Sequence, residues 1–324
     1  MNKKIGYAIL LAALLAAPFA FYSVFLMKLL CFILFACAFN LLIGFTGLLS
    51  FGHAAFFGGG GYVAGYALTK VGLPAELALV LGTAAGAVLG LIMGALAIRR
   101  QGIYFTMITL ALAQMFYFVA LQAPFTGGED GLQGVPRGKL IGSVDLSNDL
   151  TMYYVVLAIV VGAFALISRI VHSPFGRVLK AIKENEPRAI SLGYDVNQYK
   201  LLALVLSAAL AGLAGATKTL VLGFETLTDV HWSMSGLVVL MTLVGGMGTL
   251  FGPIVGAVVI IVLENKLGEF GNLLADLTSI EWFRSLGESV TIVTGLIFIV
   301  CVLAFRRGIV GEIIARRSKK LAAR

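Results

Sequence analysis

Long apolar stretches recur along the chain, and they limit its possible folds more than any other feature of the sequence. A bilayer core about 30 Å thick takes roughly 20 residues of helix to cross. Continuous apolar runs favour such helices, whereas a barrel would alternate apolar and polar residues. Lys218 is the only charged residue in these runs, which lie near 5–27, 29–50, 52–69, 77–98, 103–123, 151–168, 201–222, 237–263 and 289–305. We therefore predict an all-α, polytopic membrane bundle of about 8–10 transmembrane helices, formed by residues 1–324 as one domain.

The composition excludes several other classes of protein. Charged residues make up 12% of the chain and apolar residues 60%, against about 25% and 45–50% in soluble domains, so no soluble catalytic domain fits. The net charge of +8 does not indicate nucleic-acid binding in such a chain. A secreted disulfide scaffold is excluded because Cys31, Cys37 and Cys301 all lie inside apolar runs.

The run 237–263 is expected to be a broken or re-entrant helix. It is longer than one crossing requires, and its middle, Gly245 to Pro253, is rich in glycine and ends in proline, which remove helix propensity and a backbone donor. Basic residues near the termini, after 98 and in the loop 169–200 mark the cytoplasmic side. Both termini fall on that side only if 237–263 crosses twice as short helices or enters and returns.

Polar residues inside apolar runs are costly in lipid and commonly face the interior of a bundle. We take ten positions as candidates for a translocation path, and the alternative is that each hydroxyl only bonds its local backbone. The candidates are Asn40, Thr46, Ser50, His53, Thr106, Thr109, Gly245, Gly246, Gly248 and Thr249. Lys218 is expected to snorkel to the outer surface. Glycines at four-residue spacing from Gly82 to Gly94 are expected to serve helix packing.

Several kinds of site are not expected. No run contains two acidic residues, so a carboxylate relay for protons or sodium lacks its groups. The three histidines are far apart in sequence, and no cysteine or carboxylate stands at ligand spacing, so no metal site is predicted. The segment 212–219 lacks the glycine that precedes the lysine of a phosphate loop. Any ATP must therefore be bound by another chain.

The basic loop 169–200 is predicted to be structured. Phe175, Val178, Leu179 and Ile182 follow helical spacing and draw one apolar stripe on a short helix. Pro187 suits the first turn of a second helix, with Gly193 after its end. The loop is expected either to rest on anionic lipid or to dock a cytoplasmic partner.

One stretch, NLLIGFTGLLSFGHAAFFG from Asn40, resembles the branched-chain amino acid ABC importer permeases of the LivM type. The loop from Gly176, the stretch from Ser235 and the arginine-rich tail 306–324 agree with it in the expected order. The resemblance covers most of residues 30–265, and the family-like core extends over about 30–305.

The resemblance implies a non-enzymatic transport subunit in a bacterial or archaeal cytoplasmic membrane. Its implied partners are a homologous second permease, two ATPases that hold ATP and Mg, and an extracytoplasmic binding protein. The segment Gly176–Gly193 would insert into an ATPase groove, although only Ala189 and Gly193 match the better-known importer loop pattern. The implied coupling residues are Gly176, Arg177, Lys180, Ala181, Lys183, Glu184, Ala189, Leu192 and Gly193.

The substrate stays open at this point. Branched-chain amino acids are the default of the family, while related permeases carry urea, short amides or other small polar solutes. The competing function is a self-sufficient secondary transporter or channel. The lack of acidic residues within the apolar runs argues against it. A structural membrane scaffold is the third alternative.

Overall fold

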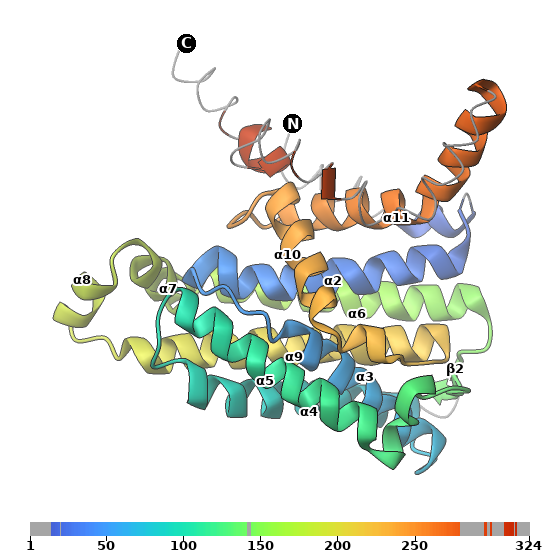
Figure 1. Ribbon diagram of the computed structural model, residues 1–324, viewed down its shortest axis with the longest axis horizontal. Coiled ribbons are helices and arrows are strands. Elements are labelled where there is room, and N and C mark those ends of the chain that lie inside the picture. The colour runs from blue at the N-terminus through green and yellow to red at the C-terminus, as the bar shows by residue number, and fades with distance from the viewer. Residues whose placement is uncertain are drawn as a thin grey trace.

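The computed structural model describes residues 14–19, 21–140, 144–278, 295–296, 299, 308–313 and 315, with the side chains of 144 and 267–278 left out. Long helices lie alongside one another (Figure 1). After a helical segment at 14–19 come α2 (Ser23–Thr46), α3 (His53–Thr69), α4 (Ala75–Ala97), α5 (Ile103–Gln122), α6 (Asp149–His172), α7 (Pro174–Glu184), α8 (Glu186–Ser191), α9 (Val196–Leu222), α10 (Trp232–Gly245) and α11 (Gly252–Thr278). The 3-10 turns η1 (Pro124–Thr126), η2 (Gly128–Asp130) and η3 (Leu227–Asp229) and the antiparallel strands β1 (Lys139–Leu140) and β2 (Val144–Asp145) complete the described elements.

The all-α, polytopic membrane fold is confirmed. Within the described residues, α2, α4, α5, α6 and α9 are long and apolar enough to cross a membrane, and α10 is a shorter apolar helix. Residues 5–13 of the first predicted span, most of 289–305 and most of the tail 306–324 lie outside the described residues. The number of crossings therefore stays a prediction.

The predicted boundary between the first two spans is wrong. We placed it at Lys28, whereas α2 begins at Ser23 and includes that lysine. A single lysine does not stop a helix when its stem can lie along apolar surface. The ammonium of Lys28 is 6.0 Å from the centre of the Phe32 ring, one turn further along the same helix.

Helix α9 packs against α4, α3 and α2. Glycines on facing helices bring the backbones into direct contact: a methyl group on Gly60 of α3 would lie 2.5 Å from the Cα of Gly212 on α9. A methyl group on Gly86 of α4 would lie 3.0 Å from the same Cα. The expectation that the Gly82–Gly94 face serves packing is confirmed, since all four glycines abut α9 or α3.

Helices α7 and α8 stand at one end of the bundle, and β2 lies at the other (Figure 1). The two helices confirm the predicted structure of the loop 169–200. Leu179 and Ile182 of the predicted stripe are buried, and Gly193 follows α8 with a φ of 88°. Asp195 caps α9 by accepting a hydrogen bond from the backbone N–H of Gln198 (3.2 Å).

The predicted break in the run 237–263 is confirmed. Helix α10 ends at Gly245 and α11 begins at Gly252, and the connection contains Gly246 and Gly248 with φ values of 121° and 78°. The expectation of two short halves is wrong for the second, because α11 has 27 residues. Its charged residues from Glu264 onward have good helix propensity and continue the helix beyond the apolar run.

Candidate functional site

The break between α10 and α11 is held by one side chain of α2. The Asn40 amide Nδ2 donates to the carbonyl of Thr249, and the N–H of Gly248 donates to Asn40 Oδ1, each at 2.9 Å. Asn40 is 2% exposed. The Thr249 hydroxyl completes the turn by donating to the carbonyl of Gly246 (2.8 Å) and accepting from the N–H of Gly252 (3.0 Å). The predicted path residues Asn40, Gly248 and Thr249 therefore form one cluster at the break.

A second group of predicted path residues surrounds the connection 47–52 between α2 and α3. Thr106 of α5 donates to the carbonyl of Leu49 (2.8 Å), and the backbone N–H of Phe51 donates to the Thr109 hydroxyl (3.2 Å). The Ser50 hydroxyl accepts from the backbone N–H of Gly52 (3.1 Å), and the Thr46 hydroxyl accepts from that of Leu48 (3.4 Å). Because Thr46, Ser50 and Thr109 are buried, their hydroxyls satisfy a non-helical segment within the bundle and line no open passage in this conformation.

His53 begins α3 directly after the second group. Its Nε2 lies 2.8 Å from the hydroxyl of Ser207 on α9, and that hydroxyl donates to the carbonyl of Ala38 on α2 (2.6 Å). The hydrogen of the Ser207 hydroxyl is already donated to Ala38. The ring nitrogen Nε2 of His53 therefore carries a proton and donates it to Ser207. The other ring nitrogen, Nδ1, is buried and makes no hydrogen bond within the described part of the chain.

Two serines outside the set of predicted path residues complete these networks. Ser207 joins α9 to α2 and α3 through His53, and Ser235 of α10 bridges the α2–α3 connection. The Ser235 hydroxyl donates to the carbonyl of Phe51 (2.7 Å) and accepts from the N–H of Ala54 (2.9 Å). Sequence alone offers only a serine in an apolar run as a signal.

The loop between α6 and α9 contacts the break through α2. The ammonium of Lys183 on α7 donates a hydrogen bond to the carbonyl of Gly44 in the last turn of α2 (2.7 Å). Burial lowers the pKa of Lys183 from its ordinary value. A methyl group on Gly44 would lie 2.8 Å from the backbone nitrogen of Gly248. Helix α7, the end of α2 and the break are thus in continuous contact.

The predicted coupling residues divide into a buried and an exposed set. Gly176 and Ala189 are buried, and Ala189 packs with Ile182 and Val196 inside the loop itself. The exposed set consists of Arg177, Lys180, Ala181, Lys183, Glu184, Leu192 and Gly193. Ala189, which matches the importer loop pattern, is 2% exposed in this conformation. The large hydrophobic side chains exposed in this loop include Ile190 (57%), Leu192 (68%) and Tyr194 (41%).

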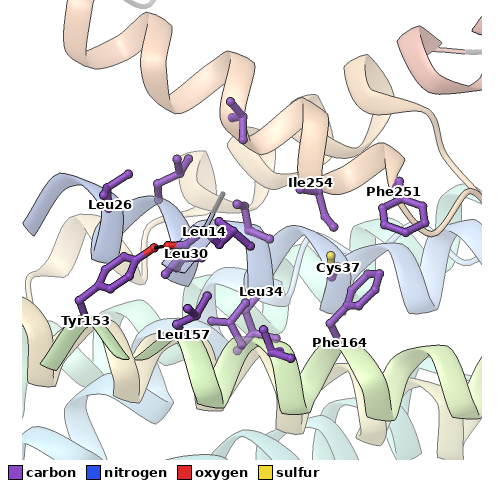
Figure 2. A pocket seen from close by; sticks show the side chains of 15 residues that line it. Leu14, Leu26, Leu30, Leu34, Cys37, Tyr153, Leu157, Phe164, Phe251 and Ile254 are labelled. Atoms are coloured by element: carbon purple, nitrogen blue, oxygen red, sulfur yellow. Dashed lines mark hydrogen bonds between the residues drawn. The ribbon is translucent and has the colours of Figure 1, made fainter. Parts of the chain in front are cut away.

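An apolar cavity of about 470 Å³ lies between α2, α6 and α11, and Phe251 of the break contributes to its wall (Figure 2). Its wall includes Leu30, Leu34 and Phe164 and none of the predicted path residues. Tyr153 at its edge donates its hydroxyl to the carbonyl of Leu14 (2.7 Å). An almost wholly apolar wall does not suit a charged or zwitterionic solute, so this cavity is not the predicted path.

The prediction that Lys218 snorkels to the outer surface is wrong. It is 4% exposed and forms ion pairs with Asp229 and Glu225, which is itself fully buried. The chain turns back after α9 at Gly223, which has a φ of 77°, and this return brings the two carboxylates beside the lysine. We missed this cluster because the acidic residues lie outside the apolar runs.

A family model and several known permeases match this chain. The family model described as "Branched-chain amino acid transport system / permease component" matches residues 21–304. The permease LivM of a high-affinity branched-chain amino acid transport system in Salmonella typhimurium is 28% identical over 74% of this chain and 62% of its own length. This chain thus spans about 62% of the length of that relative.

Two further relatives have other names. The fructose import permease FruG of Bifidobacterium longum is 28% identical over 75% of this chain and 71% of its own. The autoinducer 2 import permease LsrC of Klebsiella pneumoniae is 29% identical over 58% of this chain and 53% of its own. The set of relatives therefore includes permeases for more than one class of solute.

Proposed function

Because the chain belongs to the family of branched-chain amino acid transport system permease components, we propose that it is the transmembrane permease subunit of an ABC importer. Its membrane is the cytoplasmic membrane of a bacterium or archaeon. A homologous second permease completes the path, an extracytoplasmic binding protein delivers the solute, and two ATPase subunits bind ATP and Mg. Family membership is the observation that carries this proposal.

We propose branched-chain amino acids as the solute. The LivM relatives favour this choice, while the relatives that import fructose and autoinducer 2 make small polar solutes the alternative. Urea and short amides belong to the same alternative. A permease of this kind needs a gated passage with a few polar groups, since the binding protein supplies most of the specificity.

We propose that α7 and α8 are the coupling segment and that their end of the bundle faces the cytoplasm. Arg99 and Arg100 follow α4, and the side chain of the next residue, Gln101, donates to Glu186 of α8 (2.9 Å). Basic residues from two loops thus gather at one end, as expected of a cytoplasmic face. Both termini are proposed to lie on that side.

The contact of Lys183 with Gly44 supports a route from the ATPases to the path. When an ATPase moves α7, the ammonium of Lys183 pulls on the last turn of α2. One turn earlier in α2, Asn40 holds Gly248 and Thr249 at the break. A shift of α2 against the break would therefore change access to the cluster of Asn40, Gly248 and Thr249.

Uptake of radiolabelled leucine tests the proposed function. A strain without its own branched-chain importers would receive this permease with its neighbouring permease, ATPase and binding-protein genes. We expect the complete system to take up leucine. Isoleucine and valine should compete with this uptake, whereas fructose and urea should leave it unchanged. A hydrolysis-deficient ATPase should abolish it. Uptake by the chain alone in liposomes, driven by a proton or sodium gradient, would establish the secondary transporter instead.

A pair of variants tests the coupling segment in the same assay. Lys183→Met removes the hydrogen bond to Gly44 and is expected to lower uptake while the assembled ATPases still hydrolyse ATP. Arg169→Met removes an exposed basic side chain in the last turn of α6, just before α7, and should leave uptake unchanged. Equal uptake by the two variants would contradict the route through Lys183.

A further inference from the structure

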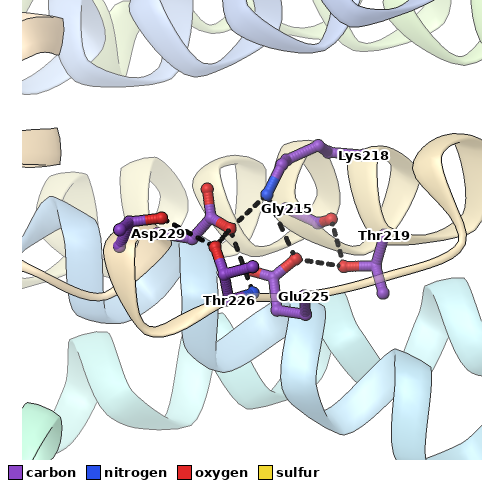
Figure 3. Close-up of polar contacts among 7 residues, drawn as sticks. Gly215, Lys218, Thr219, Glu225, Thr226 and Asp229 are labelled. Carbon is purple, nitrogen blue, oxygen red and sulfur yellow. Dashed lines mark hydrogen bonds and ion pairs between the residues drawn. The ribbon is translucent and has the colours of Figure 1, made fainter. Parts of the chain in front are cut away.

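A buried cluster of charged side chains lies at the end of α9 that is remote from α7 and α8 (Figure 3). Lys218 belongs to the last turns of α9, Glu225 to the following loop and Asp229 to η3. Each is at most 4% exposed. If all three were ionised, the cluster would bury one unbalanced negative charge, which is costly without further partners.

The hydrogen-bond donors of the cluster gather on Asp229. Its Oδ2 accepts the close ion pair with Lys218 and hydrogen bonds from the backbone N–H (3.2 Å) and hydroxyl (2.8 Å) of Thr226. Glu225 Oε2 is 3.5 Å from the Lys218 ammonium, and Glu225 Oε1 is buried with no hydrogen-bond partner among the described residues. Lys218 and Asp229 therefore form the closer pair, which is neutral, and Glu225 has only the longer contact with the ammonium.

The hydroxyl of Thr219 contacts both Glu225 and the backbone of α9, and it can donate to only one of them at a time. It lies 3.0 Å from the carbonyl of Gly215, one turn earlier in α9, and 2.6 Å from Glu225 Oε2. A hydroxyl has one hydrogen, and a carbonyl can only accept. When the Thr219 hydrogen points to Gly215, the contact of 2.6 Å requires a hydrogen on Glu225 Oε2.

There is no room beside this carboxyl for a metal ion on the side of α3. A methyl group on Gly61 would lie 2.5 Å from Glu225 Cδ and 2.6 Å from the Thr219 oxygen. A proton is the cation that balances the charge without occupying space. We propose that Glu225 is a proton-binding site: in this conformation it is a neutral carboxylic acid, and it takes up one proton from water as the loop 223–231 closes on α9 and α3.

The titratable groups around Glu225 agree with this assignment. Lys218 and Asp229 face it from α9 and η3, and Tyr62 of α3 lies within reach of both carboxylates with its hydroxyl buried and unpartnered. Further out are Tyr117 of α5, whose ring contacts His231, and Arg137, which donates to the carbonyl of Val221 (3.1 Å) and pairs with Asp149. Burial raises the pKa of Glu225 to about 8, although Lys218 opposes the shift.

The proton has a structural consequence. The backbone of Glu225 pairs with Leu132 in both directions (2.9 Å each), and the same loop leads directly into α10, whose other end is the break. With the proton bound, the loop can stay closed. Loss of the proton leaves an unbalanced carboxylate in the interior and favours an open loop in which Glu225 reaches water.

Infrared spectroscopy of the full chain in lipid nanodiscs tests the proton directly. At neutral pH we expect a carbonyl-stretch band of a protonated carboxyl group that shifts in D₂O and is missing from Glu225→Gln. Asp229→Asn should remove the same band, because Glu225 then ionises to become the counter-ion of Lys218. Glu129→Gln, at an exposed position in η2, should keep it. If Glu225→Gln instead removed a band of an ionised carboxylate from the wild-type spectrum, the proposal would be overturned.

The pH dependence of thermal unfolding gives a second, independent measurement. Glu225 binds its proton more tightly in the folded chain than in the unfolded chain, so its contribution to stability is present at low pH and is lost as pH rises from about 4.5 to about 8. The unfolding temperature of the wild type should fall over this window relative to that of Glu225→Gln, whose amide keeps the size of the side chain. Parallel profiles for the two proteins would refute the proton site. Neither measurement uses transport, so the proposed function is tested separately.

Discussion

Replacing Asn40 by alanine tests whether α2 holds the break between α10 and α11. The variant loses two hydrogen bonds, to the Thr249 carbonyl and from the Gly248 N–H. A buried group left without its partner costs about 1–3 kcal/mol. Because both bonds are partly buried, we take the lower part of that range for each backbone group and expect local opening to become easier by about 2–3 kcal/mol.

Hydrogen exchange of the peptide that contains residues 246–252 measures this opening. At 1.4 kcal/mol for each factor of ten, the exchange of the Gly248 amide should accelerate roughly 30-fold or more. Asn40→Asp keeps the acceptor for Gly248 but faces the Thr249 carbonyl with a second acceptor, so it should protect the Gly248 amide better than alanine does. Asn148→Ala serves as a control, since Asn148 caps α6 and contacts no part of the break.

An unchanged exchange rate at Gly248 in Asn40→Ala would refute the reasoning. It would mean that the turn is maintained by its own bonds, chiefly those of the Thr249 hydroxyl with Gly246 and Gly252. Acceleration throughout the chain would indicate global unfolding, and the control peptides of α3 and α4 distinguish the two outcomes.

Three further outcomes are expected. Gly61→Ala should lower the unfolding temperature, because the added methyl overlaps the Glu225 carboxyl at a cost of about 1–3 kcal/mol; Gly162→Ala, which meets nothing within 4 Å, should not lower it. Leu192→Asp, at a side chain that is 68% exposed, should abolish co-purification of the ATPases while the chain still inserts, and Asn197→Asp should not. A cysteine at Ser50, which is fully buried, should react with water-soluble thiol reagents only when the ATPases are trapped with nucleotide.

Much of the fold could be predicted because apolar length and glycine position are local properties of the sequence. The break at 245–253 followed from residues that weaken a helix wherever they stand, and the end of α8 followed from Gly193, a residue type that commonly ends one. The boundary at Lys28 failed because one lysine was given more weight than the helix around it. The far end of α11 failed for a similar reason, since charge ends an apolar run without ending a helix.

The site was harder to predict, because its contacts join residues distant in sequence. Asn40 and Thr249 were both singled out as polar residues in apolar runs, but nothing local indicated that they bond each other across more than 200 positions. Lys218 shows the limit most clearly. Its setting in an apolar helix predicted escape to water, while its partners Glu225 and Asp229 lay beyond the run and reached it only through a turn.

The glycine contacts among α3, α4 and α9 have a consequence for how the molecule can move. Where Gly60, Gly86 and Gly212 meet, main chain touches main chain, and no side chain lies between them that could change rotamer. Sliding one of these helices by a fraction of a turn would drive a larger residue into a backbone. The three helices therefore behave as one solid block. A transporter built on such a block has to place its moving parts around it, and α10, attached through a loop at one end and a break at the other, has the freedom that the block lacks.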